Sequence, residues 1–190
     1  MCQNQEFDSR LRTIENKLDQ LLAHVSNNLE FRGQNEFNEI IKFLTSPSEY
    51  RSALKFLTNW AKKAKKLTIA DPYLLSFDKT KNNPTLSNYV DALTSTLPRN
   101  IKLLEVFHLP SPNRKIANSV KEYCYENGIR FENYSTTVIH DRVWIKDDTE
   151  AIIIGTSFGG IGNKLAFVLP LPPSDLNEFK QELQQIRTKK

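Results

Sequence analysis

The chain has 190 residues and a formal net charge of +4, with 39% hydrophobic and 25% charged residues. This composition is typical of a globular protein and excludes a disordered one. No apolar run approaches the roughly 20 residues that span a bilayer, and the first residues lack the apolar core of a secretory signal. Only Cys2 and Cys124 are cysteines, too few for a disulfide framework or a zinc site, so we expect a reducing, cytoplasmic location.

Residues 1–30 are predicted to form a coiled-coil oligomerisation helix. Their apolar positions are spaced by four and three residues in turn, which is the a/d pattern of a coiled coil. A single helix of this length is marginal in water, so its apolar side needs a partner. That partner is either the chain's own domain, a different protein or, as we favour, further copies in a homodimer or higher homo-oligomer. The apolar positions within residues 7–25 are Phe7, Leu11, Ile14, Leu18, Leu21 and Val25.

Residues 36–190 are predicted to form a second domain in which helical and strand patterns alternate. This alternation favours an α/β sandwich with a mixed sheet. The expected helices cover residues 36–44, 48–65, 86–97, 113–126 and 174–187. The expected strands cover residues 66–71, 101–107, 129–134, 137–146, 151–154 and 164–169.

The most informative segment is residues 139–147, which is followed by the small-residue turn 155–157. If residues 137–146 form one strand, the side chains of His140 and Arg142 point to the same face. An imidazole can attack phosphorus or shuttle a proton, and a guanidinium offers a fixed set of donors to phosphoryl oxygens. The pattern therefore predicts a site for phosphate chemistry.

Residues at the ends of other predicted strands could border this site. Asp71 and Tyr73 follow the first strand and His108 follows the second. Ligands of α/β proteins usually bind at the carboxyl ends of strands. A structural interpretation stays open, in which the histidine and arginine of the segment only pair with carboxylates such as Asp141 or Asp71.

The same segment resembles the signature of the phospholipase D superfamily, His-x-Lys-x-x-x-x-Asp followed by a Gly-Ser turn. Arg replaces the lysine, and no asparagine stands at the usual distance after the turn, since Asn163 lies farther along. The His-Asp-Arg variant is also similar to non-catalytic phospholipase D-like domains that bind membranes, such as those attached to microtubule-interacting-and-trafficking domains. The matching candidate catalytic residues are His140, Arg142, Asp147, Thr156 and Ser157, and the candidate phosphate-binding residues are Arg142, Gly155 and Lys164.

The resemblance implies a half-enzyme, because the chain carries one copy of a signature that two-lobed members carry twice. Two chains would then pair, and each would supply one His140, the first as nucleophile and the second as acid and base. Arg142 and the 155–157 turn would stabilise negative charge, while Asp147 would orient the strand. Such a mechanism needs no metal and no cofactor.

A basic cluster lies beside Trp60 and suits nucleic acid, although it is equally the ordinary solvated end of a helix. Our leading hypothesis is a metal-independent phosphodiesterase, a hydrolase of the nuclease type, with nucleic acid favoured over lipid. The alternative is a non-catalytic phospholipase D-like scaffold that binds phosphorylated ligands or a protein partner. The candidate nucleic-acid-binding residues are Lys62, Lys63, Lys65 and Lys66.

Overall fold

The computed structural model of the protein describes Lys17, residues 47–163 and residues 166–189. The chain divides into two compact units, residues 1–39 and residues 40–190. Apart from Lys17, which is helical and exposed, the predicted coiled coil lies outside the described residues, as does the helix predicted over residues 36–44. The oligomerisation helix therefore stays a prediction.

Six strands form one mixed sheet in the order β3-β2-β1-β4-β5-β6. β1, β2 and β3 run parallel to one another, whereas each of the next three strands is antiparallel to its neighbour. The strands are β1 (Lys66–Ala70), β2 (Leu103–His108), β3 (Arg130–Ser135), β4 (Val143–Lys146), β5 (Glu150–Ile154) and β6 (Val168–Pro170). The predicted mixed sheet is thus confirmed.

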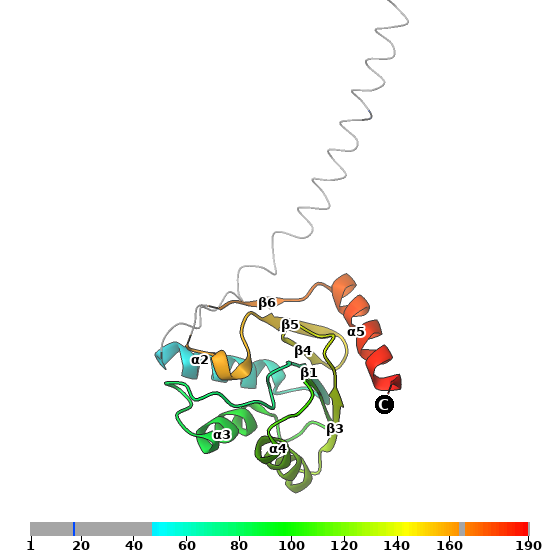
Figure 1. Ribbon diagram of the computed structural model, residues 1–190. Coiled ribbons are helices and arrows are strands. Elements are labelled where there is room, and N and C mark those ends of the chain that lie inside the picture. Colours follow the sequence, from blue (N-terminus) through cyan, green and yellow to red (C-terminus); the bar gives the residue numbers. More distant parts are fainter. Residues whose placement is uncertain (1–16, 18–46, 164–165, 190) are drawn as a thin grey trace, which may run out of the picture. The chain divides into compact units, whose positions relative to one another are not determined.

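Helices cover both faces of this sheet, as Figure 1 shows, with α2, α3 and α4 on one side and α5 on the other. Alternate residues of each strand point to opposite faces, so the sheet contributes to two cores. Ile69 and Trp144 pack with the three-helix side, while Phe107 and Ile145 pack with α5. The helices are α2 (Pro47–Ala61), α3 (Leu86–Thr96), α4 (Arg114–Glu126) and α5 (Pro173–Thr188), with a short 3-10 helix η1 (Phe158–Gly160) after β5.

Two predicted boundaries are wrong for reasons that lie in the topology. The strand predicted over residues 137–146 begins only at Val143. β3 is an edge strand and β4 lies on the far side of β2 and β1, so residues 136–142 must cross two strands of about 4.8 Å spacing each. The helix predicted to reach residue 65 ends at Ala61, because the chain must turn before the backbone of Lys65 accepts a hydrogen bond from Lys102.

Within the part of the chain that the structure describes, no helix is long and apolar enough to cross a membrane.

Candidate functional site

One end of the sheet gathers the chemically active side chains. Ala70, the last residue of β1, pairs with Phe107 near the end of β2 and with Val143 at the start of antiparallel β4. Val143 in turn pairs with Ile153 near the end of β5. We call this edge the site end and the edge at Lys66 and Lys146 the opposite end. Residues that follow β1, β2 and β5, or precede β4, therefore meet at the site end.

His140 lies at the site end, in the crossing loop and not on a strand. Its side chain is exposed, and no hydrogen bond or ion pair of its ring is found with any other described residue. Its neighbour Ile139 is buried against the α5 face of the sheet, which fixes the loop on the domain. The imidazole is therefore presented to solvent from an anchored backbone.

Arg142 is the most constrained cation at this end. The guanidinium carbon lies 5.3 Å from the centroid of the Tyr73 ring, a cation–π distance. The Nε atom is buried, and no hydrogen-bond partner for it is found among the residues that the structure describes. Buried N–H groups are rarely left unpaired, because losing a water partner without replacement costs about 1–3 kcal/mol. The Nε–H of Arg142 is therefore a donor that the described residues leave unused.

Asp71 binds the backbone of two segments at the site end. Its side chain is buried, and its two carboxylate oxygens accept hydrogen bonds from the backbone N–H groups of Tyr73 and Phe158, both at 2.9 Å. Burial raises the pKa of Asp71, and these two N–H groups and the charge of Arg142 oppose that rise only in part. The carboxylate thus fastens the end of β1 to the start of η1, the element that follows the Gly155–Ser157 turn.

The Gly155–Ser157 turn lies directly beside Arg142, because the N–H of Ile154 donates to the Arg142 carbonyl at 2.8 Å. Gly155 donates to the Phe167 carbonyl at 2.9 Å, and a Cβ there would lie 3.3 Å from the Phe167 nitrogen. Gly160 packs against the Thr156 hydroxyl so closely that any side chain would collide with it. Both glycines therefore permit a tight turn that leaves Thr156 and Ser157 half-exposed.

Asp147, in contrast, lies at the opposite end. It follows β4, and the five residue steps from Arg142 to Asp147 span roughly 16 Å at about 3.3 Å per residue. One oxygen of its carboxylate accepts hydrogen bonds from the backbone N–H groups of Lys65 and Lys66, at 2.7 and 2.8 Å. Asp147 thereby holds the start of β1 against the β4–β5 turn.

The predicted basic cluster also lies at the opposite end, before or at the start of β1. Lys66 contacts Glu105 at 2.9 Å and Asp148 at 3.1 Å, so its charge is used inside the protein. The side chains of Lys62, Lys63 and Lys65 are exposed. These four lysines are therefore separated from Arg142 by the length of β1.

Of three other candidates, Lys164 lies outside the described residues, and the side chains of Asn163 and His108 are bound to nearby backbone. Asn163 uses its side-chain amide on the Gly159 carbonyl at 3.1 Å, close to the η1 turn. His108 is buried, with Nδ1 2.7 Å from the Leu109 carbonyl, so it braces the loop after β2. No group of three or more His, Cys, Asp or Glu suited to a metal ion occurs among the residues that the structure describes.

Sequence reasoning placed Tyr73 only at the border of the site and missed its contact with Arg142. Tyr73 is 46% exposed, although its backbone is fixed by Asp71. An aromatic residue two positions after a buried strand is the only signal that the sequence offers. The sequence prediction also missed the N–H of Phe158, which donates to Asp71, because no sequence pattern marks a backbone donor.

Comparison with known proteins supports the fold. No protein-family model matches the chain, and no curated protein matches it by sequence. Among solved structures, the phospholipase D family member Nuc from Salmonella typhimurium is similar with a TM-score of 0.51 and 19% identity, covering 78% of this chain and 93% of Nuc. NucT from Helicobacter pylori gives a TM-score of 0.51 and 15% identity, covering 80% of this chain and 97% of NucT.

A longer match has a lower score. TrmBL2, an archaeal chromatin protein, aligns over 97% of this chain at 12% identity, but its TM-score of 0.44 is too low to support a statement about fold. The chain spans 66% of the length of that protein. The two matches above 0.5, together with the mixed sheet and its helices on both faces, show that this chain has a phospholipase D-like α/β fold.

Proposed function

We propose that the protein is a metal-independent phosphodiesterase of the nuclease type, with its active site at the site end of the sheet. The observation that carries this proposal is the buried, unpaired Nε–H of Arg142 next to an exposed histidine and a glycine turn. A phosphodiester oxygen supplies the acceptor that Arg142 lacks, and a charge-assisted hydrogen bond of this kind is among the strongest in proteins. The similarity to Nuc, a phospholipase D family member, supports the same chemistry.

In the first step, a ring nitrogen of His140 attacks phosphorus and the bond between phosphorus and the leaving oxygen breaks. His140 of the partner subunit gives its proton to that oxygen, which leaves as an alcohol. In the second step, the imidazole of the partner's His140 takes a proton from water while the water oxygen attacks phosphorus. The phosphorus–nitrogen bond then breaks, and both imidazoles return to their starting states.

Charge that develops on the phosphoryl oxygens needs donors held in place beforehand. Arg142 is fixed between the Tyr73 ring and the charge of Asp71. The turn that carries the Thr156 and Ser157 hydroxyls follows Ile154, whose N–H donates to the Arg142 carbonyl. Asp147 takes no direct part, because its carboxylate is occupied at the opposite end.

The mechanism requires two chains with their site ends facing each other. Val138, two residues before His140, is 65% exposed, and Tyr73, beside Arg142, is 46% exposed, so this end carries apolar surface that a second copy can cover. A coiled coil over residues 7–25 would raise the effective concentration of the two domains. These features support a homodimer with a shared site.

A non-catalytic scaffold that binds phosphorylated ligands or a protein partner is the second candidate, and Arg142 and Asn163 favour it. Arg is bulkier than Lys and its donors have a different geometry, so it can bind phosphate well and still misplace it for attack. The Asn163 amide, which would have to stand in for a missing site asparagine, is bound to the η1 backbone.

The test is cleavage of labelled single- and double-stranded DNA and RNA in EDTA, with dimer content matched between proteins. Wild type should cleave at least one substrate and His140→Ala should not, whereas Tyr125→Ala, an exposed change on α4, serves as the control. Cleavage that persists in His140→Ala would remove this residue from the mechanism. No cleavage by wild type, with phosphodiester binding that is lost in Arg142→Ala, would instead establish the scaffold.

A further inference from the structure

Two neighbouring segments at the site end carry a group of basic side chains that no motif marks. One is the loop that follows β1, and the other is the first turn of α4 (Arg114–Glu126), which follows the loop from β2. Their basic side chains are exposed, and no ion pair to them is found among the described residues. Asp78, in the first loop, is an exposed carboxylate beside them. We call the four basic residues Lys79, Lys81, Arg114 and Lys115 the loop basic surface.

Hydrogen bonds between the two loops hold this surface in place. The N–H of Asn113 donates to the Leu75 carbonyl at 2.7 Å, and the N–H of Leu109 donates to the Pro72 carbonyl at 3.0 Å. Pro72 lies between Asp71 and Tyr73, so the loops are joined directly to the residues that fix Arg142. The basic side chains therefore extend outward from an ordered wall next to the candidate site.

The charges of α4 run against its dipole. Arg114 and Lys115 occupy the first turn, where the helix dipole disfavours cations, and Glu126 is the last residue, where it disfavours anions. Each unfavourable charge costs about 0.3–1 kcal/mol in an exposed helix. Departures from a local rule of this kind are expected at functional positions. A phosphate before the first turn would be attracted by both the two cations and the dipole.

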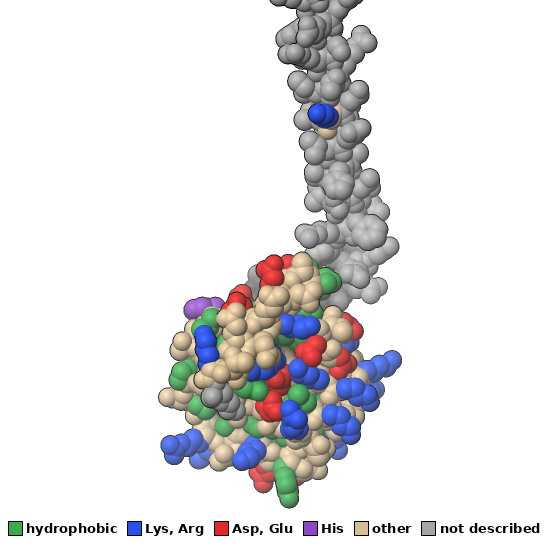
Figure 2. All heavy atoms as spheres, turned by 90° about the vertical axis from the view of Figure 1, so that its right-hand side faces the viewer, with side chains coloured by type: hydrophobic (Ala, Val, Ile, Leu, Met, Phe, Trp, Pro, Cys, Tyr) green, Lys and Arg blue, Asp and Glu red, His purple; other side chains and the backbone are tan. Residues whose placement is uncertain are grey.

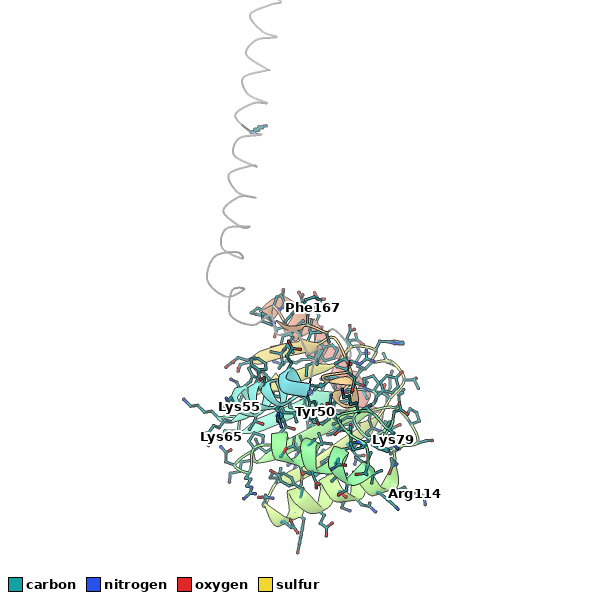
Figure 3. The ribbon with its side chains drawn as sticks, turned by 90° about the vertical axis from the view of Figure 1, so that its left-hand side faces the viewer. Tyr50, Lys55, Lys65, Lys79, Arg114 and Phe167 are labelled. Atoms are coloured by element: carbon teal, nitrogen blue, oxygen red, sulfur yellow. The ribbon has the colours of Figure 1, made fainter. Side chains whose placement is uncertain are left out.

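The opposite end is less suited to a polyanion. Figure 3 shows Lys65 on one side of the domain and both Lys79 and Arg114 on the other. Carboxylates accompany the lysines at that opposite end, since Asp147 binds the backbone of Lys65 and Asp148 pairs with Lys66. Figure 2 shows basic and acidic side chains mixed on the face that carries α5, so that face offers no surface of one sign.

We propose that nucleic acid runs across the loop basic surface and continues into the site at Arg142, with the lysines of residues 62–66 left outside its path. This inference rests on the proposed phosphodiester site, because it names what guides the substrate there. Cations repeated along two adjoining segments match the repeated phosphates of a nucleic-acid strand, which supply most of the binding free energy in such complexes.

The experiment compares two full-length variants that each lose four positive charges. The site-end variant carries Lys79→Ala, Lys81→Ala, Arg114→Ala and Lys115→Ala. The opposite-end variant carries alanine at Lys62, Lys63, Lys65 and Lys102, a lysine that precedes β2 and is exposed. Both are made in His140→Ala protein so that the oligonucleotide stays intact. Anisotropy of a labelled 24-nucleotide single strand is measured in EDTA across a range of salt concentrations.

For single strands, each phosphate contact contributes about 0.7 to the magnitude of the slope of log K against log salt concentration. With four cations removed, the site-end variant should therefore show a slope that is smaller by up to about 2.8. The opposite-end variant should lose clearly less. An equal or larger loss in the opposite-end variant, or no loss in either, would overturn the proposal. The proposal would also be overturned if the protein bound phosphatidylserine vesicles in the absence of DNA and the site-end variant lost that binding. Failure of the catalytic proposal is seen separately, as absent cleavage by wild type, and leaves this comparison valid.

Discussion

Glu105 links the central sheet to α5, and we predict that neutralising it strongly destabilises the domain. Its side chain is 4% exposed and accepts hydrogen bonds from Arg187 Nε and Nη2 at 2.8 and 3.0 Å, and from the Thr68 hydroxyl at 2.8 Å. Lys66 Nζ lies 2.9 Å away. Burial alone would raise the pKa of Glu105, but these partners outweigh it and lower the pKa below its usual value.

Glu105→Gln keeps the size of the side chain and leaves Arg187 and Lys66 without their shared counter-charge. Removing one partner of a buried ion pair costs about 3–5 kcal/mol. Total stabilities are about 5–15 kcal/mol, so the loss is a large fraction. At about 2–4 °C per kcal/mol for a domain of this size, Tm should fall by roughly 6–20 °C. The wild-type contribution is present above the usual carboxyl pKa of 4.5 and is lost as pH falls through the lower folded-state pKa.

The assay is urea unfolding followed by tryptophan fluorescence at neutral pH and at acid pH. Glu132→Gln is the matched control, because Glu132 pairs with an Arg130 side chain that is 70% exposed, and such pairs contribute about 0–1 kcal/mol. The Glu105→Gln deficit should shrink as the pH falls. A deficit no larger than that of Glu132→Gln, or one that stays constant with pH, would refute the reasoning.

Three further substitutions follow from contacts at the two ends of the sheet. Asp147→Ala leaves the backbone N–H groups of Lys65 and Lys66 without their acceptor, and urea unfolding should show a loss of about 1–3 kcal/mol, whereas no loss would mean that the carboxylate does not hold the turn. Burial raises the pKa of Asp71, so the protonated side chain stabilises the folded state at pH values below the usual carboxyl pKa of 3.8. This stabilisation is lost as the pH rises through the folded-state pKa. Asp71→Asn should flatten that part of the pH–stability curve, and an unchanged slope contradicts the assignment. Gly160→Ala should displace the Thr156 hydroxyl and weaken binding of a dinucleotide without changing the circular dichroism spectrum, and undiminished affinity would show that the turn tolerates a side chain.

The arrangement of layers was predictable because it is written in local patterns. The last four residues of β5 (Glu150–Ile154) are a short apolar run, and α4 follows Asn113, whose side chain caps the helix by accepting from the N–H groups of Lys115 and Ile116. The length of β4 was not predictable, because residues 137–142 have strand-like composition. Their conformation is decided by the position of β4 in the sheet, which is a long-range property.

The site was predictable only in part, for a related reason. The rule that ligands bind at the carboxyl ends of strands correctly brought Asp71 and Tyr73 next to Arg142. Closeness in sequence misled for Asp147, since five residues of extended chain carry it to the other end of the sheet. The partner that uses the charge of Lys66 is Glu105, which is distant in sequence, so no reading of the lysine run alone could find it.

Arg142 is proposed to offer its Nε–H to a phosphodiester, and NMR of the full-length protein measures this contact. The ¹H–¹⁵N signal of Arg142 Nε is assigned by its disappearance in Arg142→Lys and is followed during titration with the dinucleotide dTpdT in EDTA. The structure predicts that this signal and the His140 ring signals shift together and saturate with one affinity. If both stay unchanged while signals of Lys62, Lys63 or Lys65 move, the phosphate site lies elsewhere and the account is wrong.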